Sequence, residues 1–339
     1  MYKPERYLFL NDEQVSGLLS TADAYQAVSG ALECHARGEF EQPLKPYIRP
    51  RGRDQEFVGG RFIAMPAYLG GQFQIAGLKW IAGFPANVAR GLPRASGMLI
   101  LNSTETGRVL AIMECATLSA RRTAAVAAIS IDRLAPPGPR RVAVIGAGPI
   151  GHAILNALAD NPSRPIEDVR LCDTHPERAE RVAAALVGSG LPPVRVFTSA
   201  KECVAGANVI IPATAGSTGG YLKAEWLSPG WLIIAISLDD CTPRVFMSAR
   251  HIVVDDFDQC CREDKLLHRL VMAGSFSREQ VSASLGEVVA GIASWPVRQG
   301  DNVYVNPMGM AIEDLAVAST VYHKAAAMGI GQVLFSNEE

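Results

Sequence analysis

The stretch RRVAVIGAGPIG, residues 140–151, decides the fold of this chain. A short run of apolar residues leads directly into Gly146, Gly148 and Gly151, and an Ala-rich helical pattern follows. In such a strand–turn–helix unit the first glycine permits the tight turn, the second lets the backbone approach a pyrophosphate, and the third lets the helix pack on the strand. The first helical residues, Pro149 and Ile150, lie where a helix N-terminus favours an anion. The stretch therefore predicts a dinucleotide-binding turn.

The sequence after this turn alternates short apolar runs with helical patterns. Such alternation is typical of an α/β protein with a doubly wound parallel sheet, the Rossmann fold. We expect six strands, at residues 142–145, 169–172, 194–197, 209–211, 232–236 and 252–254.

An acidic residue at the end of the second expected strand bears on the choice of dinucleotide. Asp173 comes about 20 positions after Gly151, where a carboxylate accepts hydrogen bonds from the adenosine ribose hydroxyls and repels a 2′-phosphate. NAD is therefore favoured over NADP, although Arg178 in the next helix could serve a phosphate. The alternative without a ligand is that the glycines make an ordinary tight turn and that Asp173 caps a helix.

Two further strand ends are candidates for the nicotinamide side of the site. Ligands of doubly wound sheets bind at the carboxyl ends of the strands. Thr214 follows the fourth expected strand, and residues 235–238, which include Ala235, Ile236 and Ser237, lie at the end of the fifth.

The remainder of the chain has mixed helical and strand patterns and predicts an α+β domain. We expect helices at 22–34 and 119–134 and a long helical tail at 309–328 that returns to this domain. Strands are expected at 61–65, 75–81, 98–101 and 109–114, with a hairpin turn at 102–108 and a Pro-rich linker at 136–139. The predicted domains are a substrate-binding and dimerisation domain at 1–125 with 308–339, and a Rossmann domain at 126–307.

Composition excludes several classes of protein. The 339 residues carry 32 Lys+Arg against 34 Asp+Glu and no long basic run, which does not fit a nucleic-acid binder. The apolar runs are far shorter than a membrane span and the start MYKPERY is not a signal peptide, so we expect a cytoplasmic protein. Seven dispersed cysteines without a CxxC pair predict reduced thiols rather than zinc. The acidic segment VVDDFDQCCREDK, 253–265, contains no His, and helix capping and ion pairing are favoured over a metal site.

Isolated cations in apolar or glycine-rich settings are candidate substrate-binding residues. An Arg pairs bidentately with a carboxylate, whereas a Lys gives a compact charge whose pKa can fall on burial, so that it can also act as an acid or base. The alternative for each is a structural ion pair or a solvated side chain, and a bland surface role is favoured more for Arg121 than for Arg122. The candidates are Lys45, Lys79, Arg94 and Arg122.

Four motifs together resemble the ornithine cyclodeaminase and mu-crystallin family of NAD(P)-dependent enzymes over nearly the whole chain. They are GLKW at 77–80, RRTAA at 121–125, GAGPIG at 146–151 and NPMGMAIEDLAVA at 306–318. The resemblance implies that Lys79 lies beside the substrate carboxylate, that Arg122 and Thr123 lie near cofactor and substrate, and that Thr214, residues 235–238 and Met308 contact the cofactor. It also implies a catalytic aspartate after the fifth Rossmann strand, where SLDDC offers Asp239 and Asp240, with Asp240 slightly favoured.

The resemblance also implies an activity and partners. The segments QPLKPY, RASGMLILN and VVDDFDQCCREDK look most like those of members that oxidise a secondary amine joining glutamate to 2,3-diaminopropionate, with a PLP-dependent synthase supplying that substrate to siderophore or peptide pathways. Ile63 stands where cyclodeaminases carry a glutamate, and Arg94 where they carry a smaller polar residue, which disfavours a plain cyclodeaminase. The alternatives are a cyclodeaminase that acts as an ammonia lyase, an amino acid or imine dehydrogenase, or a binding protein like mu-crystallin. A homodimer joined through the first domain is implied as well.

Overall fold

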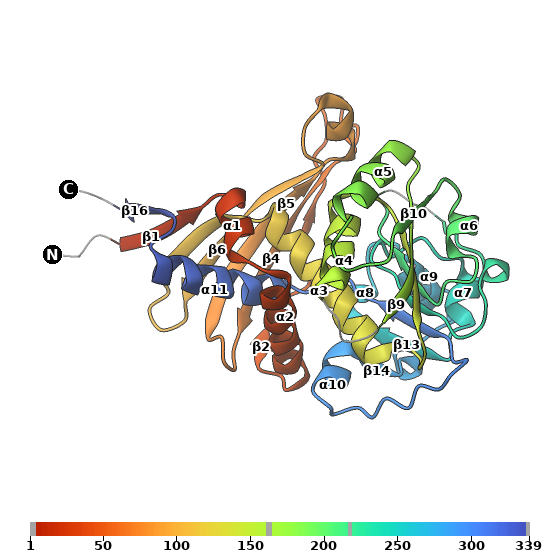
Figure 1. The fold of residues 1–339 in the computed structure, drawn as a ribbon. Coiled ribbons are helices and arrows are strands. Elements are labelled where there is room, and N and C mark those ends of the chain that lie inside the picture. The colour runs from red at the N-terminus through yellow and green to blue at the C-terminus, as the bar shows by residue number, and fades with distance from the viewer. Residues whose placement is uncertain (1–4, 161–164, 216–218, 337–339) are drawn as a thin grey trace. The chain divides into compact units, whose positions relative to one another are not determined.

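The computed structural model describes residues 5–160, 165–215 and 219–336, and the chain divides into two units (Figure 1). Unit 1 is Met1–Arg122 with Met310–Glu339, and unit 2 is Thr123–Gly309. The predicted boundaries at 125/126 and 307/308 lie within three residues of these divisions. Helix α3 (Ala116–Leu134) runs through the first of them.

The sheet of unit 1 is a meander of antiparallel strands extended at both edges. The strand order is β16-β1-β7-β6-β5-β4-β2, with β3 paired to β4 and with β1 parallel to β7. The predicted hairpin at 102–108 is confirmed by the antiparallel pairing of β6 with β7. The elements are β1 (Glu5–Leu10), α1 (Asp12–Leu18), α2 (Thr21–Ala36), β2 (Phe40–Glu41), β3 (Tyr47–Ile48), β4 (Arg61–Leu69), β5 (Ile75–Gly83), η1 (Pro85–Arg90), β6 (Ala95–Ser103), β7 (Val109–Glu114), α11 (Ala311–Met328) and β16 (Gln332–Ser336).

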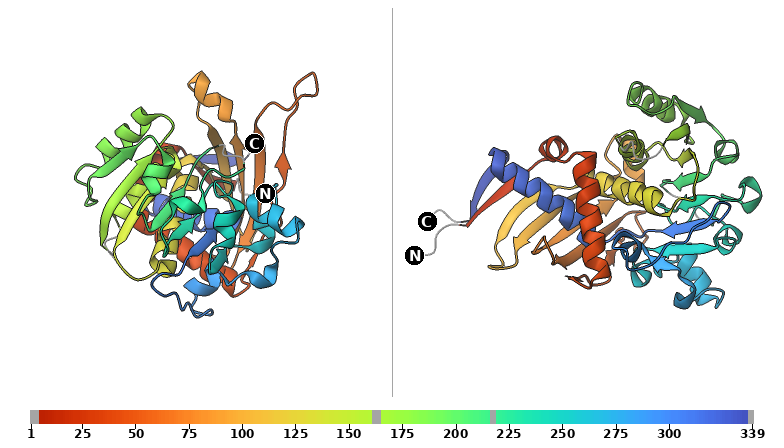
Figure 2. Two further views of the ribbon diagram at one scale, coloured as in Figure 1. Left: turned by 90° about the vertical axis from the view of Figure 1, so that its right-hand side faces the viewer. Right: turned by 60° about the horizontal axis from the view of Figure 1, so that its bottom comes forward.

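Strand alternation decides which side chains of this sheet are buried. Met65, Lys79, Leu99 and Met113 lie opposite one another on β4 to β7, and each is at most 4% exposed. Helices α2 and α11 lie side by side over the sheet (Figure 2). Lys79 is therefore a charged residue in an otherwise apolar row, and burial of such a charge requires a partner.

The sheet of unit 2 is parallel and doubly wound, as predicted, with helices on both of its faces (Figure 1). Its order is β10-β9-β8-β11-β12-β15-β13-β14, so that the direction of winding reverses between β8 and β11. The elements are β8 (Arg140–Ile145), α4 (Pro149–Ala159), β9 (Ile166–Cys172), α5 (Pro176–Ala185), β10 (Val194–Phe197), α6 (Ala200–Val204), β11 (Val209–Pro212), η2 (Ala224–Trp226), β12 (Leu232–Ile234), α7 (Pro243–Met247), β13 (His251–Val254), α8 (Phe257–Cys260), α9 (Leu266–Met272), η3 (Arg278–Gln280), β14 (Ala283–Ser284), α10 (Leu285–Val289) and β15 (Val303–Asn306).

Two details of the strand prediction are wrong. In unit 2 the described residues form eight strands rather than six, because β14 and β15 were not predicted, and β15 lies between β12 and β13. The fifth strand ends at Ile234 instead of residue 236, because the chain turns there and Leu238 takes a left-handed conformation, with φ of 70°. Among the described residues, no helix is both long and apolar enough to cross a membrane.

Candidate functional site

The glycine-rich turn after β8 leaves open space where a phosphate would approach. A Cβ atom on Gly146, whose φ is 113°, would lie 2.5 Å from the carbonyl oxygen of Ala213, and one on Gly151 would lie 1.9 Å from that of Gly146. A Cβ on Gly148 would meet no atom within 4 Å. Gly148 is the N-cap of α4 and Pro149 its first residue, so the amide donors of this helix end border that space. Close packing therefore requires glycine at positions 146 and 151, whereas Gly148 leaves room for a ligand.

Asp173 follows β9 and ties the glycine-rich turn to the next helix. Its Oδ2 atom accepts a hydrogen bond from the backbone amide of Ala147 at 2.7 Å, and its Oδ1 atom accepts one from that of His175 at 2.8 Å. His175 is the N-cap of α5, which has no side-chain cap hydrogen bond, so the capping alternative is not realised. A carboxylate has about four acceptor positions, which leaves room for ribose hydroxyls. The residues at the turn and at Asp173 thus fit a dinucleotide.

The loops that follow β11 and β12 are joined by hydrogen bonds. The amide of Thr214 donates to the Ser237 hydroxyl at 3.0 Å, and the amide of Ser237 donates to the Pro212 carbonyl at 3.2 Å. Thr214 also donates its hydroxyl proton to Oδ1 of Asp240 at 2.6 Å. Ala235 and Ile236 lead into this loop, and Ala235 is fully buried. The structure therefore brings together the cofactor candidates of both strand ends.

The two aspartates of the SLDDC segment have different surroundings. Asp239 forms an ion pair with Arg269 at 2.6 Å. Asp240 is fully buried, and its Oδ2 atom has no hydrogen-bond partner among the described residues. Burial and then the charge of Asp240 raise the pKa of Tyr221, a residue that sequence reasoning did not single out.

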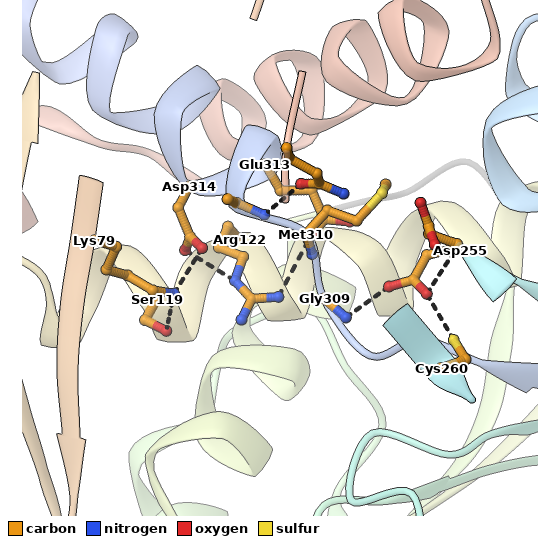
Figure 3. A network of polar contacts seen from close by, with 12 residues as sticks. Lys79, Ser119, Arg122, Asp255, Cys260, Gly309, Met310, Glu313 and Asp314 are labelled. Carbon is orange, nitrogen blue, oxygen red and sulfur yellow. Dashed lines mark hydrogen bonds and ion pairs between the residues drawn. The ribbon is translucent and has the colours of Figure 1, made fainter. Parts of the chain in front are cut away.

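The loop that carries Met308 is held by the acidic segment of residues 253–265 (Figure 3). Oδ2 of Asp255 accepts a hydrogen bond from the amide of Gly309 at 2.6 Å, and the Cys260 thiol lies 3.0 Å from both Oδ1 of Asp255 and the Asn306 carbonyl. Asp256 caps α8 through the amide of Gln259 at 2.9 Å. The predicted capping role of this segment is confirmed for Asp256, and Asp255 anchors a distant loop.

In unit 1, Lys79 and Arg122 meet at a carboxylate from the C-terminal helix (Figure 3). Lys79 Nζ lies 2.6 Å from Oδ2 of Asp314, and Arg122 Nε lies 3.1 Å from Oδ1 of the same residue. Arg122 Nη1 lies 3.1 Å from Oε2 of Glu313, and Lys79 Nζ lies 3.4 Å from the Ser119 hydroxyl. Burial is the largest influence on Lys79, and its pKa is lowered although Asp314 opposes this effect.

The other two candidate cations of unit 1 lie outside the strands, Lys45 shortly before β3 and Arg94 just before β6. Lys45 is 4% exposed and precedes Pro46, whose carbonyl accepts from the amide of Ala64 on β4. Arg94 is exposed and stands just before β6, whose first residue pairs with Gly83, about 13 Å along β5 from Lys79. The structure therefore does not pair Arg94 with Lys79.

Arg121 and Thr123 flank Arg122 on α3. Arg121 donates hydrogen bonds to the Ser16 carbonyl at 2.8 Å and to the Leu19 carbonyl, contacts that tie α3 to the end of α1. Thr123 is buried, at 7% exposure.

Sequence reasoning missed Glu313 and Asp314 as site residues, although it quoted the motif that contains them. The signal was available in AIEDLAVA, residues 311–318, where two adjacent acids interrupt an apolar helix. Both are fully buried, and buried acids in such a helix require cationic partners.

Comparisons with known proteins agree with this geometry. Residues 5–329 match the model of the Ornithine cyclodeaminase/mu-crystallin family. The chain is 37% identical to N-((2S)-2-amino-2-carboxyethyl)-L-glutamate dehydrogenase of Staphylococcus aureus, over 97% of both chains. An archaeal alanine dehydrogenase dimer with bound NAD has a TM-score of 0.83 at 29% identity, covering 97% of this chain and 99% of that one. The Delta(1)-pyrroline-2-carboxylate reductase of Thermococcus litoralis, solved with NADH and L-proline, has a TM-score of 0.86 at 25% identity, covering 96% and 99%.

These relatives match the chain from end to end, so their similarity covers the dinucleotide turn as well as the buried cations. The predicted class, a nicotinamide-dependent oxidoreductase, is confirmed. The chain belongs to the ornithine cyclodeaminase/mu-crystallin family.

Proposed function

We propose that this protein oxidises N-((2S)-2-amino-2-carboxyethyl)-L-glutamate with NAD and releases 2-oxoglutarate and L-2,3-diaminopropionate. The observation that carries the proposal is the 37% identity to the dehydrogenase of that name over 97% of both chains. The substrate has three carboxylates, and the candidate cations of unit 1 supply matching charges: Lys45 and Lys79 are buried, Arg122 shares Asp314 with Lys79, and Arg94 is exposed.

The reaction consumes one NAD and one water. A bound nicotinamide would supply the hydride acceptor for the hydrogen on the glutamate α-carbon of the substrate. Loss of that hydride and of the proton on nitrogen converts the C–N single bond into an imine. Water then adds to the imine carbon and the C–N bond breaks, so that the products are 2-oxoglutarate, the free amine of diaminopropionate, NADH and one proton.

Lys45, Lys79, Arg94 and Arg122 hold substrate carboxylates in this proposal. A Lys has three N–H donors and an Arg five; Lys79 donates to Asp314 and Ser119, and Arg122 donates to Asp314 and Glu313. Protons for the addition of water move through Lys79 or through an aspartate after β12. Asp240 is favoured over Asp239 for this role, because Asp239 is already paired with Arg269.

NAD rather than NADP is the proposed cofactor. The Asp173 carboxylate at the end of β9 supports this choice, because it would repel a 2′-phosphate. Gly146, Gly148, Gly151 and the start of α4 would hold the pyrophosphate, and Thr214, residues 235–237 and Met308 the nicotinamide side.

We also propose a homodimer joined through the sheet of unit 1. Phe62, Trp80 and Met98 lie on the sheet face opposite to Lys79, and Trp80 and Met98 are 38% and 39% exposed. The rings of Phe62 and Trp80 stack with centroids 5.5 Å apart. Exposed apolar faces of this kind mark interaction surfaces, and the archaeal relative is described as a dimer.

A cyclodeaminase is the second candidate, and Ile63 argues against it. This residue occupies the position of the cyclodeaminase glutamate and pairs with Ile81 and Tyr47, so the position offers no carboxylate. Absorbance at 340 nm with NAD separates the candidates when synthetic N-(2-amino-2-carboxyethyl)-L-glutamate, L-ornithine, L-alanine and L-glutamate are compared. The proposal expects one NADH per 2-oxoglutarate and diaminopropionate formed. Proline and ammonia from ornithine without net NADH would overturn it.

A further inference from the structure

Asp314 lies between Lys79 and Arg122, two of the four cations that the sequence assigned to substrate carboxylates. Each of its oxygens contacts a different cation, Oδ2 with Lys79 and Oδ1 with Arg122 (Figure 3). The three side chains come from β5, α3 and α11, which are far apart in sequence. The side chains of Lys79 and Asp314 are 2% and 0% exposed, so this ion pair is withdrawn from water.

Burial alone would favour the neutral amine of Lys79. Desolvation is the largest cause of its lowered pKa, the positive charge of Arg122 lowers it further, and the charge and hydrogen bond of Asp314 raise it. The remaining facing groups are Ser119 and Cys115, and burial raises the pKa of Cys115 to about 12, so its thiol carries no charge near pH 7. Asp314 is therefore the carboxylate in contact with Lys79 that opposes the loss of its proton.

We propose that Asp314 is a positioning residue of the reaction, which keeps Lys79 protonated and fixed relative to Arg122. This proposal rests on the proposed function, in which Lys79 contacts the substrate. A charged Lys79 attracts a substrate carboxylate and can donate a proton, whereas a neutral amine has no charge to offer a carboxylate and can only accept a proton.

The matched pair Asp314→Asn and Glu313→Gln tests this role. Both variants remove one buried negative charge from the first turn of α11, but only Asp314 contacts Lys79, whereas Glu313 contacts Arg122 and the amide of Met310. Lysine labelled with ¹³C at Cε reports the charge state of Lys79 by NMR, and loss of the signal in Lys79→Arg assigns it. This readout needs no substrate, so it remains informative if the proposed function is wrong.

We expect the Lys79 signal of Asp314→Asn to titrate at least about one pH unit below that of the wild type, a tenfold loss of proton affinity. Glu313→Gln should shift it less. In the reaction, the basic limb of the pH profile of kcat/KM should move to lower pH by the same amount and should vanish in Lys79→Arg. Coincident titrations of wild type and Asp314→Asn, or a limb that persists in Lys79→Arg, would overturn the proposal.

A variant that keeps the charge covers the case in which Asp314→Asn does not fold. Asp314→Glu retains the carboxylate on a longer stem, so its Lys79 signal should titrate near the wild-type position while kcat falls, because the geometry is altered. If the Lys79 signal of Asp314→Glu instead titrates about one pH unit or more away from that of the wild type, the carboxylate does not set the protonation of Lys79.

Discussion

Asp255 and Gly309, 54 residues apart in sequence, are joined by a hydrogen bond of 2.6 Å from the glycine amide to the carboxylate (Figure 3). Asp255 is fully buried, so its removal leaves a buried donor without its acceptor. We expect Asp255→Ala to lower the free energy of unfolding by about 1–3 kcal/mol and to weaken NADH binding through the loop of Met308. Urea unfolding and NADH fluorescence titration measure the two effects.

Asp258→Ala is the control for this prediction. Asp258 belongs to the same acidic segment, but it is exposed and pairs with the exposed Arg278. Exposed ion pairs contribute little, so the stability of this variant should stay within about 1 kcal/mol of the wild type. Equal losses in the two variants would contradict an anchoring role for Asp255.

The second prediction compares alanine substitutions at Gly148 and Gly151, because the added Cβ atom has different surroundings at the two positions. Gly148 has φ of −78° and open space around its Cβ position, so Gly148→Ala should fold with wild-type stability and bind NADH at least about tenfold more weakly. Gly151→Ala should lose stability by about 1–3 kcal/mol, because its Cβ would overlap the Gly146 carbonyl. NADH titration and urea unfolding check both variants. Wild-type NADH affinity in Gly148→Ala would exclude this turn as the pyrophosphate site.

Asp173 is predicted to set the preference for NAD. Asp173→Asn keeps the size of the side chain but removes the charge that would repel a 2′-phosphate, so the ratio of kcat/KM for NADP to that for NAD should rise at least about tenfold. Steady-state kinetics with both dinucleotides measure this ratio. Adding Arg178→Gln to Asp173→Asn should reverse part of the gain if Arg178 serves the phosphate. An unchanged ratio in Asp173→Asn would mean that another residue selects the cofactor.

The sequence predicted best what a local pattern determines. The glycine-rich turn, Asp173 and the hairpin at 102–108 each depend on a few adjacent residues, and all lie as expected. The position of β15 between two earlier strands depends on pairing across the sheet, which a run of four residues does not encode. The partner of Lys79 was missed for the same reason, because Asp314 lies 235 residues further along the chain. The adjacent acids Glu313 and Asp314 within an otherwise apolar helical pattern were the local sign of that contact.

The apolar face of the unit 1 sheet leads to a prediction about assembly. The wild-type protein should have the mass of a dimer by light scattering, and Trp80→Asp should shift it to the mass of a monomer, because a charge would be buried in the interface. Val187→Asp is the matched control: Val187 is an exposed apolar residue of unit 2, at 84%, and its replacement should leave the mass unchanged. A monomeric wild type, or a dimeric Trp80→Asp, would be inconsistent with this interface.

Asp168 on β9 predicts how stability depends on pH. Its carboxylate lies 2.6 Å from Arg170 Nε and 2.6 Å from Arg195 Nη2. Burial would raise the pKa of Asp168, but hydrogen bonds from Arg195 and Arg170 lower it below the usual value of 3.8. A carboxyl group whose pKa is lower in the folded state stabilises the protein above its unfolded pKa, and this stabilisation is lost as pH falls through the folded pKa.

Asp168→Asn should therefore lower the free energy of unfolding by about 1 kcal/mol at pH 7, and the difference from the wild type should shrink as pH falls below about 4. Urea unfolding of both proteins at pH 7, 5, 4 and 3 follows this difference. Glu167→Gln is the control, because Glu167 is exposed and points to the other face of β9 from Asp168. A gap between wild type and Asp168→Asn that stays constant down to pH 3 would show that the ion pairs do not contribute through the charge of Asp168.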